Sequence, residues 1–146
     1  MKAQSEIVID ASNLILGRMA TVVAKHLLHG ECVVILNAEK TVVSGKRLSK
    51  VQEAKGKLNI GHPRKGPYWP RQPDRYVKRA IRGMLPRQTP KGKEAYTRLR
   101  VFIGVPPEFR DNPGKTVSEA KAEKLKCSYI TVGELTKEIG WHPVGE

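Results

Sequence analysis

The sequence is poor in cysteine and has no long apolar run. Its 146 residues include two cysteines, Cys32 and Cys127, too few for a disulfide-stabilised scaffold and typical of a reducing, intracellular setting. No apolar stretch approaches the roughly 18 residues that a membrane-spanning helix needs. The N-terminus also lacks the apolar stretch of a secretory signal. We therefore expect neither an integral membrane protein nor a secreted one.

Acidic residues are scarce, and their scarcity is local. The chain has 14 Asp and Glu against 27 Lys and Arg, a net charge of +13. Residues 55–100 carry 14 of the basic residues but only two acidic ones, Asp74 and Glu94, whereas the other 100 residues sum to +1. A surplus confined to one third of the chain indicates a polyanionic partner. Nucleic acid is the first candidate. An anionic membrane surface, which prefers a basic helix with a large exposed apolar face, is the second.

The first part of the chain predicts a strand, a helix and a second strand. The aliphatic runs at 7–9 and 33–36 are typical of buried strands, expected over 7–10 and 33–36. Between them, apolar residues recur at helical spacing over 14–29, and Ser12 or Asn13 can cap that helix. Such a unit has a right-handed crossover and places two parallel strands in one sheet.

The rest of the chain alternates further elements with loops. After Asn112-Pro113-Gly114 the composition becomes charge-balanced, so we expect one α/β domain over 1–109 and a C-terminal extension, not a separate domain, over 110–146. Further strands are expected at 41–43 and 100–103, and further helices at 46–58, 73–84, 94–99, 118–126 and from Thr131 through Ile139.

The helix that begins at Pro73 combines an apolar side with a basic side. Val77, Ala80, Ile81 and Met84 form one stripe at helical spacing, which can pack on the core. The other face carries four cations at the same spacing: Arg75, Lys78, Arg79 and Arg82.

Two basic loops flank this helix, at residues 59–73 and 87–93. The first of them contains aromatic residues. Residues 59–73 are rich in glycine and proline and enclose Tyr68-Trp69. Exposed rings between cations can stack on unpaired bases, although Trp69 could instead anchor the loop on its own domain. His62 could act as a base, but an RNA contact through its ring is the reading we favour. The residues expected to bind RNA are Lys55, Lys57, His62, Arg64, Lys65, Tyr68, Trp69, Arg71, Arg75, Lys78, Arg79, Arg82, Arg87, Lys91, Lys93 and Arg98.

Nucleotide-binding motifs are incomplete in this sequence. The turn after the first strand contains only Gly17 and lacks the further glycines that let a backbone wrap a pyrophosphate. Gly61 and Gly66 have the separation of a P-loop, but Pro67 and Tyr68 stand where that loop needs Lys and Ser or Thr. We expect no nucleotide cofactor and no small-molecule substrate.

Metal binding and catalysis are equally weakly supported. His26, His29 and Cys32 are spaced three apart, and Cys127 could complete a zinc site. A buried cysteine at the head of a strand needs no metal, however. Neither aspartate before residue 111 has an acidic neighbour or a clear histidine partner. We therefore expect no metal, no cofactor and no enzymatic activity.

Several motifs, in the same order along the chain, resemble one known family. They are Ile9-Asp10-Ala11, Leu16-Gly17-Arg18-Met19-Ala20, Val34-Ile35-Leu36-Asn37-Ala38, Ile81-Arg82-Gly83-Met84-Leu85-Pro86, Gly92-Lys93 and Leu99-Arg100-Val101-Phe102-Ile103-Gly104. Over about residues 7–107 the sequence resembles the universal large-subunit ribosomal protein family numbered thirteen. The stretch 129–135 is similar to the archaeal and eukaryotic branch, and the longer insertion of the bacterial form is absent.

This resemblance implies both a fold and a role. It implies a three-layer α/β/α fold around a four-stranded parallel sheet of order 3-2-1-4, with the residues of 82–86 and 92–93 facing RNA. It implies a cytoplasmic, ribosome-bound structural protein that binds large-subunit rRNA early in assembly, beside neighbouring ribosomal proteins, without catalysis, a membrane or self-association. Two alternatives stay open: an RNA-processing enzyme, which would need a carboxylate or histidine cluster beside the basic face, and a free RNA-binding translational regulator.

Overall fold

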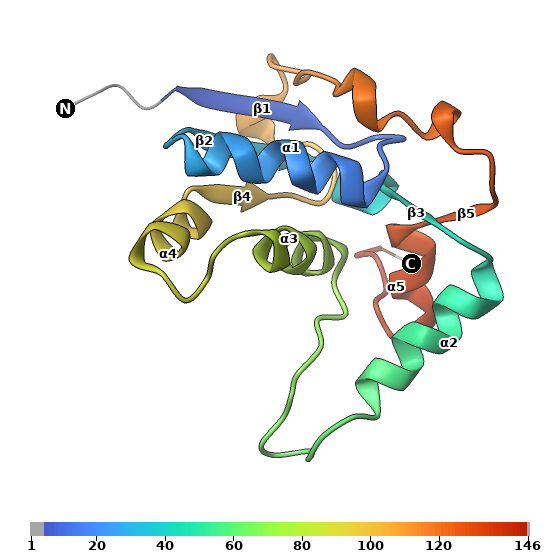
Figure 1. Ribbon diagram of the computed structural model, residues 1–146. Coiled ribbons are helices and arrows are strands. Elements are labelled where there is room, and N and C mark those ends of the chain that lie inside the picture. The colour runs from blue at the N-terminus through green and yellow to red at the C-terminus, as the bar shows by residue number, and fades with distance from the viewer. Residues whose placement is uncertain (1–4, 146) are drawn as a thin grey trace.

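The computed structural model describes residues 5–145. Figure 1 shows a small sheet with helices packed against it and a long loop that extends away from it. In chain order the elements are β1 (Glu6–Asp10), α1 (Leu16–Leu28), β2 (Cys32–Leu36), η1 (Ala38–Lys40), β3 (Val42–Ser44), α2 (Arg47–Leu58), α3 (Pro73–Met84), α4 (Pro90–Thr97), β4 (Leu99–Val101), η2 (Pro107–Phe109), η3 (Ser118–Ala120), η4 (Ala122–Lys124), β5 (Tyr129–Thr131) and α5 (Val132–Glu138), where η marks a short 3-10 turn.

The parallel sheet has the strand order β1-β2-β4. The register pairs Val8 with Val34, and Val34 with Arg100. β2 is central because residues 33–36 are buried on both faces, as interior parallel strands are. No named strand pairs with the outer edge of β1 in the described chain; the backbone N–H of Lys115 donates there to the Val8 carbonyl at 2.8 Å. The expected order 3-2-1-4 is therefore wrong, because β4 lies beside β2 and not beside β1.

β3 does not belong to the parallel sheet. It pairs antiparallel with β5, so that Val42 lies opposite Thr131 and Val43 opposite Ile130. Ile130 is 1% exposed, and the backbone N–H of Val132 donates to the Thr41 carbonyl at 2.8 Å. The expectation of one four-stranded sheet is thus corrected to a three-stranded parallel sheet and a two-stranded antiparallel one. A local pattern could not reveal this, because the partner strand comes from the C-terminal extension.

Helices cover one face of the parallel sheet. On that face Ile9 and Val33 join α1, α3 and α4 in the main apolar cluster. On the other face, in the described part of the chain, Val34 and its neighbours pack against Phe102 and Phe109, whose ring centroids lie 5.9 Å apart. A 3-10 turn and a loop therefore stand where the implied three-layer arrangement would have a helical layer.

The turn between β1 and α1 differs from the predicted helix cap. α1 begins at Leu16 after Ile15, and no side chain caps it. Ser12 instead donates its backbone N–H and its hydroxyl to Asp10 Oδ1, at 3.0 and 2.8 Å, and Asn37 Nδ2 donates to the same oxygen at 2.9 Å. Asn13 has a positive φ of 56°, outside the helical region. The polar residues close the turn through Asp10 and leave the helix end uncapped.

The C-terminal extension follows the surface closely rather than forming the expected helix over 118–126. Two short turns, η3 and η4, occupy that stretch. Ala120 and Ala122 are both buried, and their backbones bond to Ile15 and Asn13 at 2.6 and 2.8 Å. Two buried residues at a spacing of two do not fit one face of an α-helix, which explains the difference. The predicted cap of the last helix is confirmed, since Thr131 Oγ1 accepts from the Glu134 N–H.

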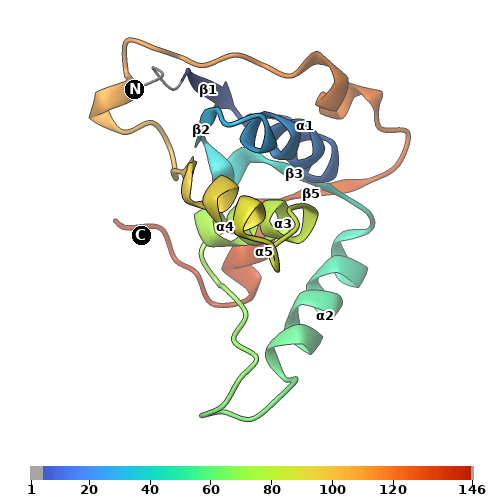
Figure 2. The same cartoon turned by 60° about the vertical axis from the view of Figure 1, so that its left-hand side comes forward.

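This fold brings the basic segment together on one side. Figures 1 and 2 show residues 59–72, between α2 and α3, as an arm that projects away from the sheet in both views. α3 continues directly from this arm, and α4 lies near the other end of α3. Over residues 5–145, none of the helices has the length and apolar character needed to cross a membrane.

Candidate nucleic-acid interface

The basic face is built on α3. Pro73 occupies its first turn and Asp74 follows, a start that needs no backbone N–H donor there and favours a carboxylate. Val77 and Ile81 are fully buried against the core, as the apolar stripe predicts, whereas Met84 is 44% exposed. With this side packed, the opposite side of α3 must face solvent. It presents Arg75, which is exposed, and Lys78, Arg79 and Arg82, which are half-buried.

Arg79 ties the arm to α3. Its Nη1 donates to the Tyr68 carbonyl at 3.1 Å, and its guanidinium carbon lies 3.9 Å from the centre of the Trp69 ring. Lys57 Nζ approaches the same ring at 5.1 Å. Trp69 is therefore held by two cations of its own domain, which is the anchoring alternative rather than an open stacking surface. Burial, followed by the positive charges of Arg82 and Arg87, lowers the pKa of Arg79 from its ordinary value.

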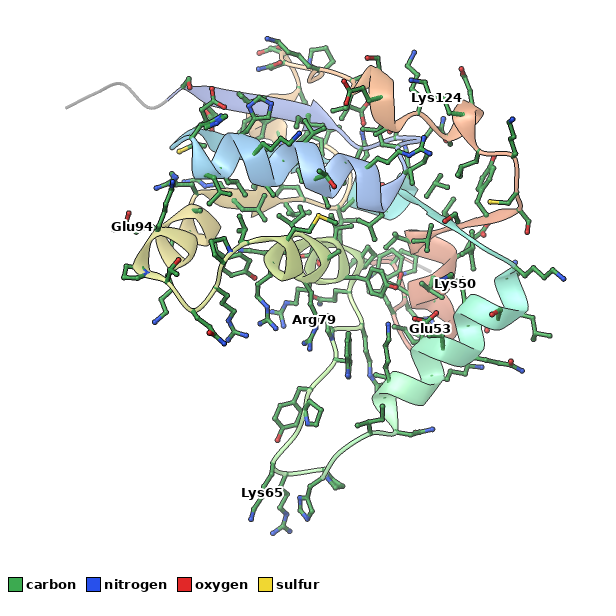
Figure 3. The ribbon with its side chains drawn as sticks, viewed as in Figure 1. Lys50, Glu53, Lys65, Arg79, Glu94 and Lys124 are labelled. Carbon is green, nitrogen blue, oxygen red and sulfur yellow. The ribbon has the colours of Figure 1, made fainter. Side chains whose placement is uncertain are left out.

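The tip of the arm is exposed and carries cations. The backbones of His62 and Gly66 bond to each other at 3.1 and 2.8 Å and close a tight turn. His62 Nδ1 accepts from the Arg64 N–H at 3.1 Å, so this ring helps to shape the turn. Figure 3 shows Lys65 at the end of the arm, farthest from the sheet. Arg64 and Lys65 are both exposed.

A concave pocket lies between α3, α4 and the root of the arm. Its volume is about 510 Å³, and Arg75, Lys78, Arg82, Tyr68 and Tyr96 contribute to its lining. Lys78 Nζ lies 5.1 Å from the centre of the Tyr96 ring. Tyr68 is 66% exposed, and its hydroxyl donates to a carbonyl of the arm. Cations and rings thus meet in one hollow.

The positive charge of this face is not neutralised within the protein. Over residues 5–145, Lys57 is the single residue of the basic segment that joins an ion pair, with Glu53 at 3.0 Å. That pair, together with the bond from Lys50, lowers the pKa of Glu53. Asp74, in the pocket lining, pairs with no cation in the described chain. Clustered cations without an acidic partner create a positive potential at the surface, which attracts polyanions.

The remaining predicted residues divide into two groups. The first group is exposed and lies on α2, the arm, the loop before α4 and α4 itself: Lys55, Arg71, Arg87, Lys91 and Lys93. Arg98 behaves differently. Its Nη2 donates to the Leu27 carbonyl at 2.8 Å, while its Nε is buried without a hydrogen-bond partner among the described residues. Arg98 therefore caps the C-terminal end of α1, where a cation also meets the helix dipole favourably.

Tyr96 and Asp74 are among the pocket residues that the sequence did not predict. Tyr96 lies on α4, which begins at Pro90 and is capped by Thr89 through the Gly92 N–H at 3.2 Å. The predicted helix over 94–99 was too short to show which face this ring occupies. The Thr89-Pro90 pair, a cap followed by proline, was the available signal. Asp74 is not among the predicted site residues, and nothing local indicates that it lies in a pocket.

Acidic, histidine and cysteine side chains are the other candidates for chemistry in the described residues. Within the described range 5–145, no three His, Cys, Asp or Glu side chains come together in a way that could hold a metal ion. Asp10 is engaged in the β1–α1 turn. Burial raises its pKa, but the bonds from Asn37 and Ser12 and the charge of Lys40 outweigh this, so its pKa is lowered overall.

Comparison with known proteins identifies the family. The family model described as Ribosomal protein L13 matches residues 4–108. Proteins named "Large ribosomal subunit protein uL13" are similar over most of both chains. The one from Methanosarcina barkeri is 46% identical over 135 residues, covering 91% of this chain and 96% of its own, and the one from Methanocaldococcus jannaschii is 44% identical over 138 residues with the same coverage.

A third relative agrees, and all three are archaeal. The protein of that name from Archaeoglobus fulgidus is 43% identical over 139 residues, which span 94% of this chain and 89% of the relative. These matches confirm the resemblance read from the motifs, including its branch, and the expectation of a ribosomal protein that is not an enzyme. The chain belongs to the ribosomal protein L13 family.

Proposed function

We propose that this chain is a structural component of the large ribosomal subunit that binds large-subunit rRNA through α3, α4 and the arm 59–72. The observation that carries the proposal is the unneutralised charge of this face, gathered on one side of an otherwise nearly neutral fold. The names of the relatives place them in the large subunit. The cytoplasmic ribosome is the corresponding location, with rRNA and adjacent ribosomal proteins as partners.

The mechanism is electrostatic positioning. Each phosphate that a Lys or Arg neutralises releases condensed counterion, so the affinity falls linearly with salt on logarithmic axes. Arginine can bridge two phosphate oxygens in a planar fork, which suits an irregular RNA surface. Because Arg79 holds the root of the arm, less conformational entropy is lost there when RNA binds. The exposed tip of the arm extends beyond the surface of the domain.

The arm also favours early joining during assembly. A projecting segment with cations at its tip is most easily accommodated before the surrounding RNA has closed around it. We therefore expect the protein in the earliest large-subunit precursors. Pulse-labelled precursor particles separated by sedimentation should contain it, and its first appearance in late particles would contradict early joining.

A matched pair of charge variants tests RNA binding. The first, Arg75→Gln/Lys78→Gln/Arg82→Gln, removes three cations of α3 but keeps Arg79, which anchors the arm. The control, Lys121→Gln/Lys124→Gln/Lys126→Gln, removes three exposed cations of the extension; Figure 3 shows Lys124 on the opposite side of the molecule from Lys65. Binding to a large-subunit rRNA transcript is measured against salt concentration, with circular dichroism as the check on folding.

The expected outcome differs between the two variants. The α3 variant should give a slope of log affinity against log salt that is shallower by about two to three, since each lost phosphate contact removes about 0.7–0.9. The control should keep the parent slope. Equal slopes for a folded α3 variant and its control would refute this face as the RNA-binding surface. Co-sedimentation with large subunits at low salt separates a subunit component from a free regulator, which would remain at the top of the gradient.

A further inference from the structure

The pocket beside α3 has features that simple charge neutralisation does not require. A surface that only meets phosphates can be flat, whereas this one is a hollow of about 510 Å³, within the 300–1,000 Å³ usual for small-molecule sites. Aromatic rings from two separate segments, Tyr68 of the arm and Tyr96 of α4, line it together with the α3 cations. The combination of rings and cations in one hollow suits a ligand with both an aromatic part and a phosphate.

Tyr68 is the ring best placed to stack on that aromatic part. Trp69 is already occupied by Arg79 and Lys57, and the Tyr96 ring faces Lys78. Tyr68 is 66% exposed but not loose, since its hydroxyl donates to a carbonyl of the arm. Its ring also lies against Gly66, where an added Cβ would come within 3.2 Å of it. Because these contacts already hold the ring, Tyr68 loses little conformational entropy when a base stacks on its exposed face.

Asp74 adds a polar group of the opposite sign. Asp74 is among the lining residues, while its Oδ1 is buried and has no hydrogen-bond partner among residues 5–145. A base in the pocket cannot contact that buried oxygen, so the carboxylate acts on a bound base through its negative charge. Guanine presents two adjacent donors, its ring N–H and its amino group, which a nearby negative charge attracts. Uracil presents one N–H between two carbonyl oxygens, which the carboxylate repels.

We propose that this pocket holds one unpaired nucleotide of the bound RNA, with its base on Tyr68, its phosphate against Arg75, Lys78 and Arg82, and a preference for guanine imposed by Asp74. The proposal rests on the RNA-binding role above and adds to it a site for a single base. Only a nucleotide outside a helix can enter, because a paired base has no free face to stack.

Short RNAs of equal charge test the site. In a Trp141→Phe background the fluorescence of Trp69, which also lines the pocket, reports binding. Three pentanucleotides are compared: UUGUU, UUUUU and UU-abasic-UU. The phosphates are the same in number, so differences report the central base. We expect UUGUU to bind about tenfold more tightly than the abasic RNA, the size of one base–aromatic stack, and UUUUU to fall between them.

Two variants separate the contributions of the ring and the carboxylate. Tyr68→Leu should remove the advantage of UUGUU over the abasic RNA, whereas Tyr129→Leu, which changes an exposed tyrosine on β5, should keep it. Asp74→Asn should tighten the binding of UUUUU and of the abasic RNA, because a negative charge leaves, and it should abolish the preference for guanine over uracil.

The outcomes distinguish this site from the general RNA-binding role. If UUGUU and the abasic RNA give the same signal, including no binding of either, the single-nucleotide site is wrong. If the rRNA transcript still binds with a slope that depends on the α3 cations, the proposed function stands without it. If the transcript binds independently of those cations, both proposals fail.

Discussion

Replacing Arg79 by lysine should loosen the arm without changing the charge of the protein. Arg79 makes two contacts that lysine cannot reproduce together: the bond to the Tyr68 carbonyl at 3.1 Å and the stack on Trp69 at 3.9 Å. A hydrogen bond to a charged group contributes about 1.5–3 kcal/mol, and a cation over a ring at a solvated site about 0.5–1 kcal/mol. Because Arg79 is half-buried and lysine keeps part of the ring contact, we expect a loss of about 2 kcal/mol.

That loss should appear as local detachment rather than global unfolding. At 1.4 kcal/mol per factor of ten, about 2 kcal/mol corresponds to a roughly thirtyfold increase in the detached population. Chymotrypsin reports it directly, because the Tyr68–Trp69 bond that it can cut carries the carbonyl that Arg79 holds. When reclosing is faster than cleavage, the cutting rate follows the open population, and the enzyme does not recognise the exchanged residue.

Arg75→Lys is the matched control on the same helix. Arg75 is exposed and holds no part of the arm, so its replacement should leave the cutting rate near that of the parent. Mass spectrometry identifies the cleaved bond, and circular dichroism shows whether the fold is intact. If Arg79→Lys is cut no faster than Arg75→Lys, Arg79 does not anchor the arm.

Three further changes probe the scaffold around this face. Gly92→Ala should lower the free energy of unfolding by about 1–3 kcal/mol in urea titrations, because the added Cβ would lie 2.0 Å from the Pro86 carbonyl oxygen and force α4 to shift. Arg98→Met should cost about 1.5–3 kcal/mol in the same assay through its lost bond to Leu27, while the salt slope for RNA stays unchanged. Asp10 has a lowered pKa, so its stabilisation is present above pH of about 4 and is lost as the pH falls through the folded-state value. Asp10→Asn should therefore be less stable at pH 7, with the deficit shrinking in unfolding curves recorded toward pH 2.

Local pattern predicted the elements better than their arrangement. The helical spacing that gave α3, with Val77 and Ile81 turned inward, and the buried run of β2 are properties of consecutive residues. Strand order depends on which segments cover the edges. The edge of β1 pairs with Lys115, and β3 pairs with β5. Both partners come from the C-terminal part of the chain, whose sequence shows little periodicity. A short strand with one buried residue fits a parallel or an antiparallel partner equally well, so the sequence alone could not place it.

The arginines of the basic segment also show that local pattern does not predict tertiary contacts. Arg75, Arg79 and Arg98 are identical side chains in one basic segment, yet one is exposed, one holds the arm and one caps α1. Spacing on a helix determines which side a residue faces, but the carbonyls of Tyr68 and Leu27 are brought near by tertiary packing. Cations already engaged inside the protein gain less from a phosphate. The salt dependence of RNA binding should therefore reflect fewer phosphate contacts than the net +12 of residues 55–100 suggests.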